Sequence, residues 1–238
     1  MPHVYHPHNA GATRIRGIIF DMDGTLTVPC IDFKKMRERA KIPQGQDILK
    51  YAHSIQNADE KKRCWQAIEE VEAEGRVGMK LQPGLIKLLN YLDAHHIKKS
   101  IVTRNSASAI VHMFEVLRDQ EKLNVCPSKS FTQLLDRGDI QNLILDSEII
   151  KQTFSHTNPT LNPHCTSVKS GTCLQKSIDD ILCGGAAGNV TCLINNEHNG
   201  DLSPLAHLNV HSLEQIITQL EEGWSIDSYH QHSDPSKL

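Results

Sequence analysis

The chain has 238 residues and a formal net charge of −3, with 22% charged and 39% hydrophobic residues. This length allows one buried core with a small accessory lobe, and the near-neutral charge gives no basis for binding nucleic acid or an anionic membrane. No apolar run reaches membrane-spanning length and no secretory leader is recognisable, so we expect a soluble, intracellular protein. The seven cysteines contain no Cys-x-x-Cys pair, which indicates reduced thiols rather than a disulfide framework or a zinc site.

The first 13 residues predict a disordered tail, because they carry a cluster of histidines with prolines between them. His3, His6 and His8 could bind a metal adventitiously, but a solvated segment is the simpler interpretation. The apolar run from Ile15 to Phe20 then predicts a buried strand.

The most informative segment follows this strand and reads Asp21-Met22-Asp23-Gly24-Thr25-Leu26-Thr27. It places two carboxylates, Asp21 and Asp23, where a strand opens into a loop, and the backbone N–H groups of Gly24 and Thr25 can face an anion. One carboxylate can attack phosphorus while the other transfers the proton. Because a phosphate dianion would repel both carboxylates, we expect a divalent cation, and Mg²⁺ suits an all-oxygen site. An Asp-Gly pair by itself would indicate only a tight turn.

Residues 31–80 predict a helical insertion between the first strand and the rest of the sheet. A long amphipathic helix should begin at Asp59 and end at Gly75. Its apolar residues have helical spacing: Trp65, Ile68 and Val71. An ordinary pair of crossover helices is the alternative to a separate cap.

Pro83-Gly84 should start a helix, and a strand should follow from Ile97 to Val102. The helix has one apolar face: Leu85, Leu88, Leu89 and Leu92. After the strand comes Thr103-Arg104-Asn105, and a hydroxyl at the end of a second parallel strand can donate to a phosphoryl oxygen. Ser106 should cap the next helix. The side chains expected to pack that helix on the sheet are Ile110, Val111, Phe114 and Leu117.

The segment from Ser177 to Gly188 contains an acidic pair, Asp179-Asp180. A strand from Val190 to Ile194 and a last helix near residues 213–220 should follow. Acidic residues are favoured at helix N-termini for electrostatic reasons, so Asp180 alone does not indicate a site.

The segment Asp21 to Thr27 resembles the first motif of the haloacid dehalogenase-like (HAD) superfamily. This resemblance implies an α/β fold, a Rossmann-like parallel sheet with helices on both faces. The helical insertion resembles the small α-helical cap of the branch that includes phosphoglycolate-phosphatase-like enzymes. The implied organisation is a core at 14–30 and 81–222 with a cap at 31–80.

The same resemblance implies roles for individual residues. Asp21 would be the nucleophile and a metal ligand, and Asp23 the acid/base, with its backbone carbonyl also on the metal. Gly24, Thr25, Thr103, Arg104 and Asn105 would bind phosphate, and Asp180 would serve the metal. Members that cleave carbon–halogen bonds lack the second Asp of the motif, so Asp23 argues for phosphoester chemistry.

Residues 119–176 do not match the family. There the family supplies a Lys-Pro pair and an apolar strand ending in Gly-Asp, whose Asp binds Mg²⁺, whereas Lys176 stands at that place here. Without that strand the sheet would lose backbone partners, which Leu143 to Ser147 could replace only in part. The candidates for a phosphate-binding lysine, by order alone, are Lys151, Lys169 and Lys176.

Two explanations of this segment stay open. A shifted reading frame is one, since the codons for residues 141–145 can spell Lys-Pro-Asp-Pro in another phase. A genuine disordered insert is the other, because residues 153–170 are rich in polar residues and proline.

The polar residues 223–238 predict a flexible tail that ends in Ser236-Lys237-Leu238, a receptor-read peroxisomal address. We therefore expect recognition by the peroxisomal import receptor and a peroxisomal location, with the cytoplasm as the alternative.

The sequence thus predicts a monomeric, Mg²⁺-dependent hydrolase that cleaves a small phosphorylated metabolite, a phosphomonoester, through an aspartyl-phosphate. One alternative is a catalytically impaired protein that binds phosphate or a partner because the Gly-Asp motif is missing. A phosphoryl-transfer mutase is another. The sequence carries no recognisable signal for the identity of the substrate.

Overall fold

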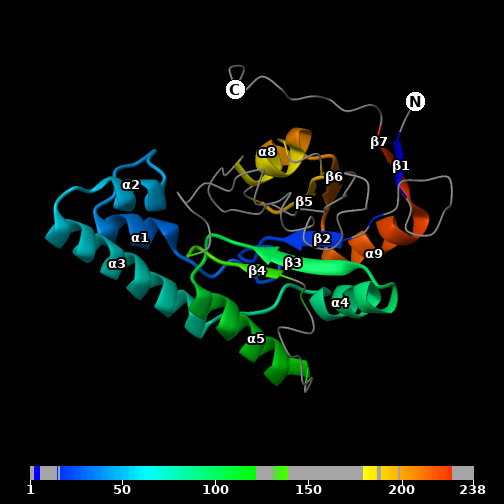
Figure 1. Ribbon diagram of the computed structural model, residues 1–238, viewed down its shortest axis with the longest axis horizontal. Helices are drawn as coiled ribbons and strands as arrows, with labels where there is room; N and C mark the ends of the chain where they lie inside the picture. Colours follow the sequence, from blue (N-terminus) through cyan, green and yellow to red (C-terminus); the bar gives the residue numbers. More distant parts are fainter. Residues whose placement is uncertain are drawn as a thin grey trace.

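A parallel sheet of short strands lies at the centre of the molecule (Figure 1). The computed structural model describes residues 3–5, 15, 17–121, 131, 133–138, 179–186, 189–197 and 199–226. Strand β2 (Gly17–Phe20) pairs in parallel with β3 (Lys98–Val102), and β3 pairs in parallel with β4 (Gln133–Leu135). All four residues of β2 are buried, which explains why its sequence is an unbroken apolar run.

Strand β4 lies within the segment 119–176 that the family resemblance left unmatched. The other edge of β2 pairs with none of the strands that the structure describes. Strand β5 (Cys192–Ile194), expected from the run starting at Val190, pairs in parallel with β6 (Leu208–Val210) as a separate two-stranded sheet.

The two segments expected as tails contribute a short antiparallel pair. Strand β1 (His3–Tyr5) pairs with β7 (Trp224–Ile226), so these parts of residues 1–13 and 223–238 are strands rather than disordered chain. The physical reason is that each strand supplies backbone partners for the other, a contact between the two ends that local composition does not reveal.

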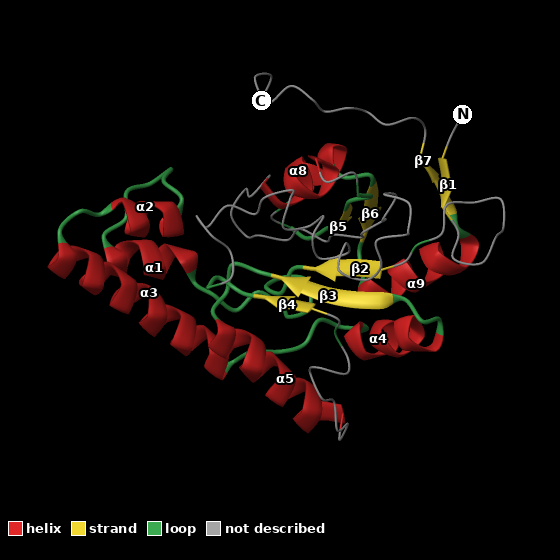
Figure 2. Cartoon of the chain, viewed as in Figure 1, coloured by secondary structure: helices red, strands yellow, loops and turns green. Residues whose placement is uncertain are grey.

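The helices expected after the first strand are present. Helix α4 (Leu85–Ala94) and helix α5 (Ala107–Glu121) lie on one side of the β2–β3–β4 sheet (Figure 2). Helix α8 (Asp179–Ala186), the short 3-10 helix η2 (Gly200–Leu205) and helix α9 (Leu213–Glu222) follow. Side chains of α4, α5, α9 and the two parallel sheets share one hydrophobic core.

The prediction that Val111 of α5 packs in the core is wrong. Val111 is 59% exposed, and Met113 is buried in its place, beside the correctly predicted Ile110, Phe114 and Leu117. Positions 111 and 113 flank the same apolar stripe, and the sequence did not determine how far the helix turns toward the sheet.

Residues 31–80 form a helical unit with a hydrophobic cluster of its own. Its helices are α1 (Phe33–Ala40), α2 (Ile48–Ser54) and α3 (Ala58–Val77). A side chain preceding each helix accepts a hydrogen bond from a backbone N–H of its first turn: Asp32, Asp47 and Asn57. The long helix α3 runs from this unit to the core (Figure 1).

Helix α3 does not stop at Gly75 as expected but continues to Val77, with Gly78 at its C-cap. A glycine inside a helix costs only about 1 kcal/mol, so it does not by itself end a helix. Gly75 instead allows a close approach, because a Cβ atom there would lie 2.7 Å from the carbonyl oxygen of Cys30.

This helical unit, which we call the cap, joins the core through two chain segments that lie side by side. Val28 N–H donates to the Lys80 carbonyl and Gln82 N–H donates to the Leu26 carbonyl, both at 2.9 Å. Nε2 of His112 on α5 lies 3.0 Å from the carbonyl oxygen of Arg76, so the end of α3 is also attached to the core.

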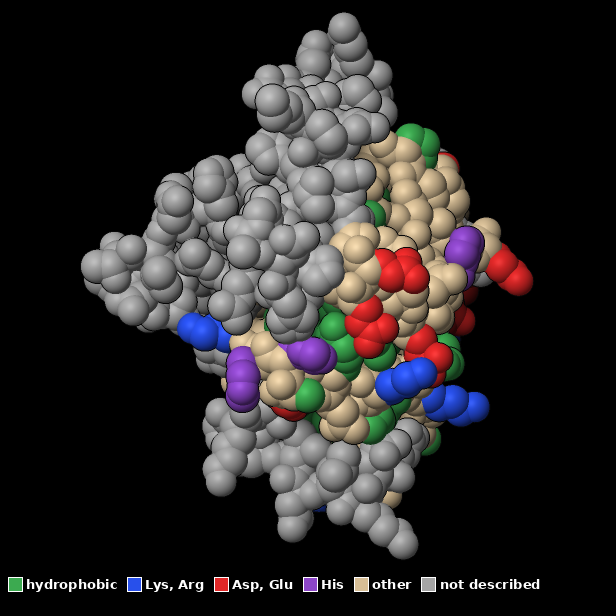
Figure 3. Space-filling view, turned by 90° about the vertical axis from the view of Figure 1, so that its right-hand side faces the viewer, with side chains coloured by type: hydrophobic (Ala, Val, Ile, Leu, Met, Phe, Trp, Pro, Cys, Tyr) green, Lys and Arg blue, Asp and Glu red, His purple; other side chains and the backbone are tan. Residues whose placement is uncertain are grey.

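At the end of the molecule away from residues 31–80, Figure 3 shows acidic side chains beside basic ones. On the surface, Nζ of Lys87 on α4 lies 3.4 Å from Oε2 of Glu214 on α9.

None of the described helices is both long enough and apolar enough to cross a bilayer. Several predictions fall outside the described residues, namely those on Leu143 to Ser147, Lys151, Lys169, Lys176 and the tripeptide Ser236-Lys237-Leu238.

Candidate active site

Asp21 and Asp23 lie directly after the buried strand β2 and are themselves buried, with exposed fractions of 7% and 6%. The loop that carries them coils around one carbonyl group, that of Met22. The backbone N–H groups of Thr25, Leu26 and Thr27 donate to it at 3.2, 2.9 and 3.0 Å. The Thr25 amide therefore already has an acceptor within the loop, which differs from the expectation that it faces an anion.

Gly24 takes a left-handed backbone conformation, with φ of 77°. Residues with a Cβ rarely adopt this conformation, so the glycine is what lets the chain turn back after Asp23. The result is a tight loop that keeps both carboxylates at the end of the strand.

The carboxyl group of Asp23 is suited to carry a proton near neutral pH. Burial raises its pKa from 3.8 to about 6, and hydrogen bonds from Cys30 oppose part of that rise. The backbone N–H of Cys30 lies 3.4 Å and its Sγ 3.9 Å from Asp23 Oδ1. Burial and the Asp23 charge raise the pKa of the Cys30 thiol to about 11, so the thiol stays protonated. A carboxyl group with a pKa near the working pH is an effective general acid and base.

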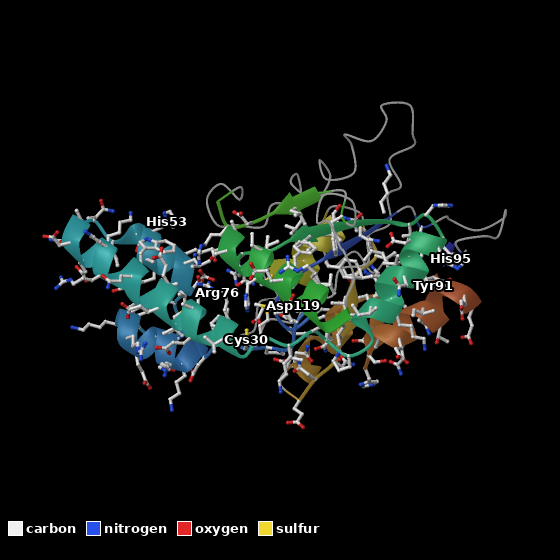
Figure 4. The ribbon with its side chains drawn as sticks, turned by 90° about the horizontal axis from the view of Figure 1, so that it is seen from below. Cys30, His53, Arg76, Tyr91, His95 and Asp119 are labelled. Carbon is white, nitrogen blue, oxygen red and sulfur yellow. The ribbon has the colours of Figure 1, made fainter. Side chains whose placement is uncertain are left out.

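Cys30 also marks where the cap meets this carboxylate. Figure 4 shows Cys30 and Arg76 near each other, where α3 reaches the core. The Cys30 carbonyl is the group that approaches Gly75 of α3. The residue that donates to Asp23 therefore lies against the last turns of the cap helix.

Thr103 is fully buried and directly follows strand β3. The parallel register pairs Phe20 with Ile101, and continuing it by two residues brings Thr103 level with Met22, between the two aspartates. Both the backbone N–H and the side-chain Nδ2 of Asn105 donate to Thr103 Oγ1, at 3.3 and 3.1 Å. The structure thus directs the Asn105 side chain to Thr103.

Arg104 points to the cap. Its Nη1 donates to Oδ2 of Asp47 at 2.8 Å, while Oδ1 of Asp47 accepts the backbone N–H groups that begin α2. Burial raises the pKa of Asp47, but the Lys50 backbone N–H and the Arg104 guanidinium outweigh it, so this pKa lies below its usual value.

A second arginine of the core contacts the cap and was missed by the sequence analysis. Arg137, just after β4, donates to both carboxylate oxygens of Glu72 on α3, at 2.6 and 3.2 Å. Its guanidinium also lies 5.3 Å from the centroid of the Trp65 ring. The backbone N–H of Arg137 donates to the Asn105 carbonyl at 2.9 Å. The available signal was a short apolar run followed by a polar turn, Asp136-Arg137-Gly138.

The donors that Asp21 and Asp23 offer fit Mg²⁺, which prefers carboxylate oxygens and commonly uses one or two of them together with substrate phosphate and water. Asp180 lies in the first turn of α8, but its side chain is outside the described part of the chain. Within that described part, no three His, Cys, Asp or Glu side chains gather as a metal-binding group. Among the described residues, the candidate metal ligands are therefore these two aspartates.

No protein-family model matches the chain. A haloacid dehalogenase-like hydrolase domain-containing protein of Arabidopsis thaliana is 38% identical over 109 residues, which are 41% of this chain and 44% of that protein. An uncharacterized hydrolase of Saccharomyces cerevisiae is 29% identical over 224 residues, 89% of this chain and 93% of that protein. The chain thus matches less than half of one relative and nearly all of the other.

Solved structures share the fold at low sequence identity. A predicted phosphoglycolate phosphatase of Haemophilus somnus has a TM-score of 0.58 and 15% identity, covering 87% of this chain and 98% of that one. A HAD-hydrolase of Bacillus subtilis bound to magnesium has a TM-score of 0.54 and 19% identity, covering 87% and 99%. Its two sequence relatives, this fold and the Asp21 motif together make the chain similar to haloacid dehalogenase-like hydrolases.

Proposed function

We propose that the protein is a Mg²⁺-dependent phosphatase that hydrolyses a small phosphomonoester through an aspartyl-phosphate on Asp21. The observation that carries this proposal is the pair of buried carboxylates after β2, with the buried hydroxyl of Thr103 at the end of the neighbouring parallel strand. Nucleophile, proton carrier and hydroxyl donor are the groups that this reaction needs.

The names of similar proteins support the proposal. One structural neighbour is called a predicted phosphoglycolate phosphatase, and another was determined with magnesium bound. At this level of identity the neighbours show a common fold, and the chemistry is argued from the residues of this chain.

In the first step, a carboxylate oxygen of Asp21 attacks phosphorus, and the bond from phosphorus to the leaving oxygen breaks. Asp23 gives its proton to that oxygen, which leaves as an alcohol. The Thr103 hydroxyl donates to a phosphoryl oxygen and stabilises the charge there.

In the second step, the Asp23 carboxylate takes a proton from a water molecule, which attacks phosphorus and releases Asp21 and inorganic phosphate. A bound Mg²⁺ supplies positive charge that offsets the repulsion between the phosphate and the two carboxylates. A pKa near 6 lets Asp23 act in both protonation states near neutral pH.

The test is Asp21→Asn, which keeps the shape of the side chain but removes the nucleophile. Hydrolysis of p-nitrophenyl phosphate and a set of small phosphomonoesters should fall by about 10³-fold or more. The exposed Asp59, at the start of α3, provides the control variant Asp59→Asn, which should keep full activity. Removing Mg²⁺ with EDTA should abolish turnover, and adding it back should restore it.

Equal activity of Asp21→Asn and wild type would refute the assignment of the nucleophile. If wild type binds inorganic phosphate but turns over no phosphomonoester, the non-catalytic alternative is the better description. Activity that depends on added sugar bisphosphate would indicate a mutase instead.

A further inference from the structure

We infer that Asn105 is a positioning residue that orients the hydroxyl of Thr103 toward the phosphoryl group, and does not bind the phosphate itself. This inference rests on the proposed function, because it takes a phosphoryl oxygen of the substrate as the acceptor of the hydrogen bond from the Thr103 hydroxyl. The loop after β3 then orients this O–H group before the substrate binds.

The argument starts from the hydrogen-bonding capacity of a hydroxyl group, which is one donated proton and two accepted hydrogen bonds. The backbone N–H and the Nδ2 of Asn105 both donate to Thr103 Oγ1, at 3.3 and 3.1 Å. Together they account for the accepting capacity of the oxygen. The bond to Cβ takes a third direction, so the O–H proton points along the remaining one, away from Asn105.

The surroundings keep Asn105 in place for this task. The carbonyl of Asn105 accepts a hydrogen bond from the backbone N–H of Arg137 at 2.9 Å, which ties the loop after β3 to the loop after β4. The intervening Arg104 is held by Asp47 of the cap at 2.8 Å. These contacts anchor the loop that carries the amide, and the amide itself is held by its hydrogen bond to Thr103 Oγ1.

An O–H group that is already oriented assists catalysis, because the donor does not need to reorient when negative charge develops on the phosphoryl oxygen. Without the Asn105 amide, Thr103 Oγ1 would keep the backbone donor but gain a free lone pair, and its proton could turn to other acceptors. The loss should therefore appear only while Thr103 has a hydroxyl group.

A double-mutant cycle tests this dependence on Thr103. Asn105→Ala should lower kcat/KM about tenfold, the scale of one hydrogen bond. Thr103→Val, which removes the hydroxyl and keeps the shape, should lower kcat/KM by about 10²–10³-fold, as expected for loss of a transition-state donor. In the Thr103→Val background, adding Asn105→Ala should cause no further loss beyond about twofold.

A second readout makes the cycle independent of turnover. The Kd for inorganic phosphate, measured by isothermal titration calorimetry in MgCl₂, should show the same pattern, with a loss from Asn105→Ala only when Thr103 is present. Absence of Asp21-dependent turnover would count against the proposed function, and the binding cycle would still decide the role of Asn105.

The control is Ser108→Ala, in the first turn of α5, which removes an exposed hydroxyl that contacts Ser106 at 2.9 Å and should leave both readouts unchanged. Asn105→Leu, which keeps a similar size and removes the donor without adding charge, replaces the alanine variant if that variant does not fold. A full tenfold loss from Asn105→Ala in the Thr103→Val background would show direct phosphate binding and overturn the inference. No loss from Asn105→Ala in either background would overturn it as well.

Discussion

The buried carboxyl group of Asp23 should destabilise the folded protein although catalysis needs it, and the variant Asp23→Asn measures the size of this destabilisation. Folding buries this carboxyl group to 6% exposure and raises its pKa from 3.8 to about 6. The folded protein then binds more protons than the unfolded chain between these two values, so its stability falls as the pH rises through this window. A difference of about 2 pH units at 1.36 kcal/mol each corresponds to about 3 kcal/mol. Asparagine cannot ionise and escapes this penalty.

We therefore expect Asp23→Asn to be more stable than wild type by up to about 3 kcal/mol above pH 6, and no more stable below pH 4. Urea unfolding in EDTA at several pH values measures this difference without a metal ion that offsets the buried charge. Phosphatase activity of the variant should be lost. A stability difference that is constant from pH 4 to pH 8, or a destabilised variant above pH 6, would refute the reasoning.

Two further predictions concern the contact between cap and core. Glu72→Gln breaks a buried ion pair and should lower the free energy of unfolding by about 3–5 kcal/mol in urea titrations, whereas Glu74→Gln on the exposed face of the same helix should have little effect. Equal effects would contradict the importance of burial. Gly75→Ala should cost about 1–3 kcal/mol, because its Cβ would meet the Cys30 carbonyl at 2.7 Å, and Gly78→Ala, with open space, should not. A stabilised Gly75→Ala variant by thermal denaturation would show that the helix can move away.

The sequence determined the features that depend on neighbouring residues. An apolar run followed by Asp21-Met22-Asp23-Gly24 sufficed to predict a buried strand, a tight loop and the chemistry of paired carboxylates, because each part depends on residues only a few positions away. The apolar face of α4 follows from the same kind of local rule.

The tertiary structure decided the direction of individual side chains. The sequence analysis assigned Arg104 and Asn105 to phosphate, but in the structure one contacts the cap and the other Thr103. Arg137 and Glu72 are 65 residues apart, and their ion pair depends on where the cap lies over the core. Sequence spacing does not carry this information.

Gly75 and Asp23 show the same limit. The sequence marks a glycine and a carboxylate, yet the Cys30 carbonyl makes the glycine necessary and burial sets the pKa of the carboxyl group. Local hydrogen bonds and periodicity act within a few residues, so the sequence alone determines strands, helices and the motif loop. Close packing and desolvation arise between segments distant along the chain, so only the folded protein determines which residues position, pair with and tune the two aspartates.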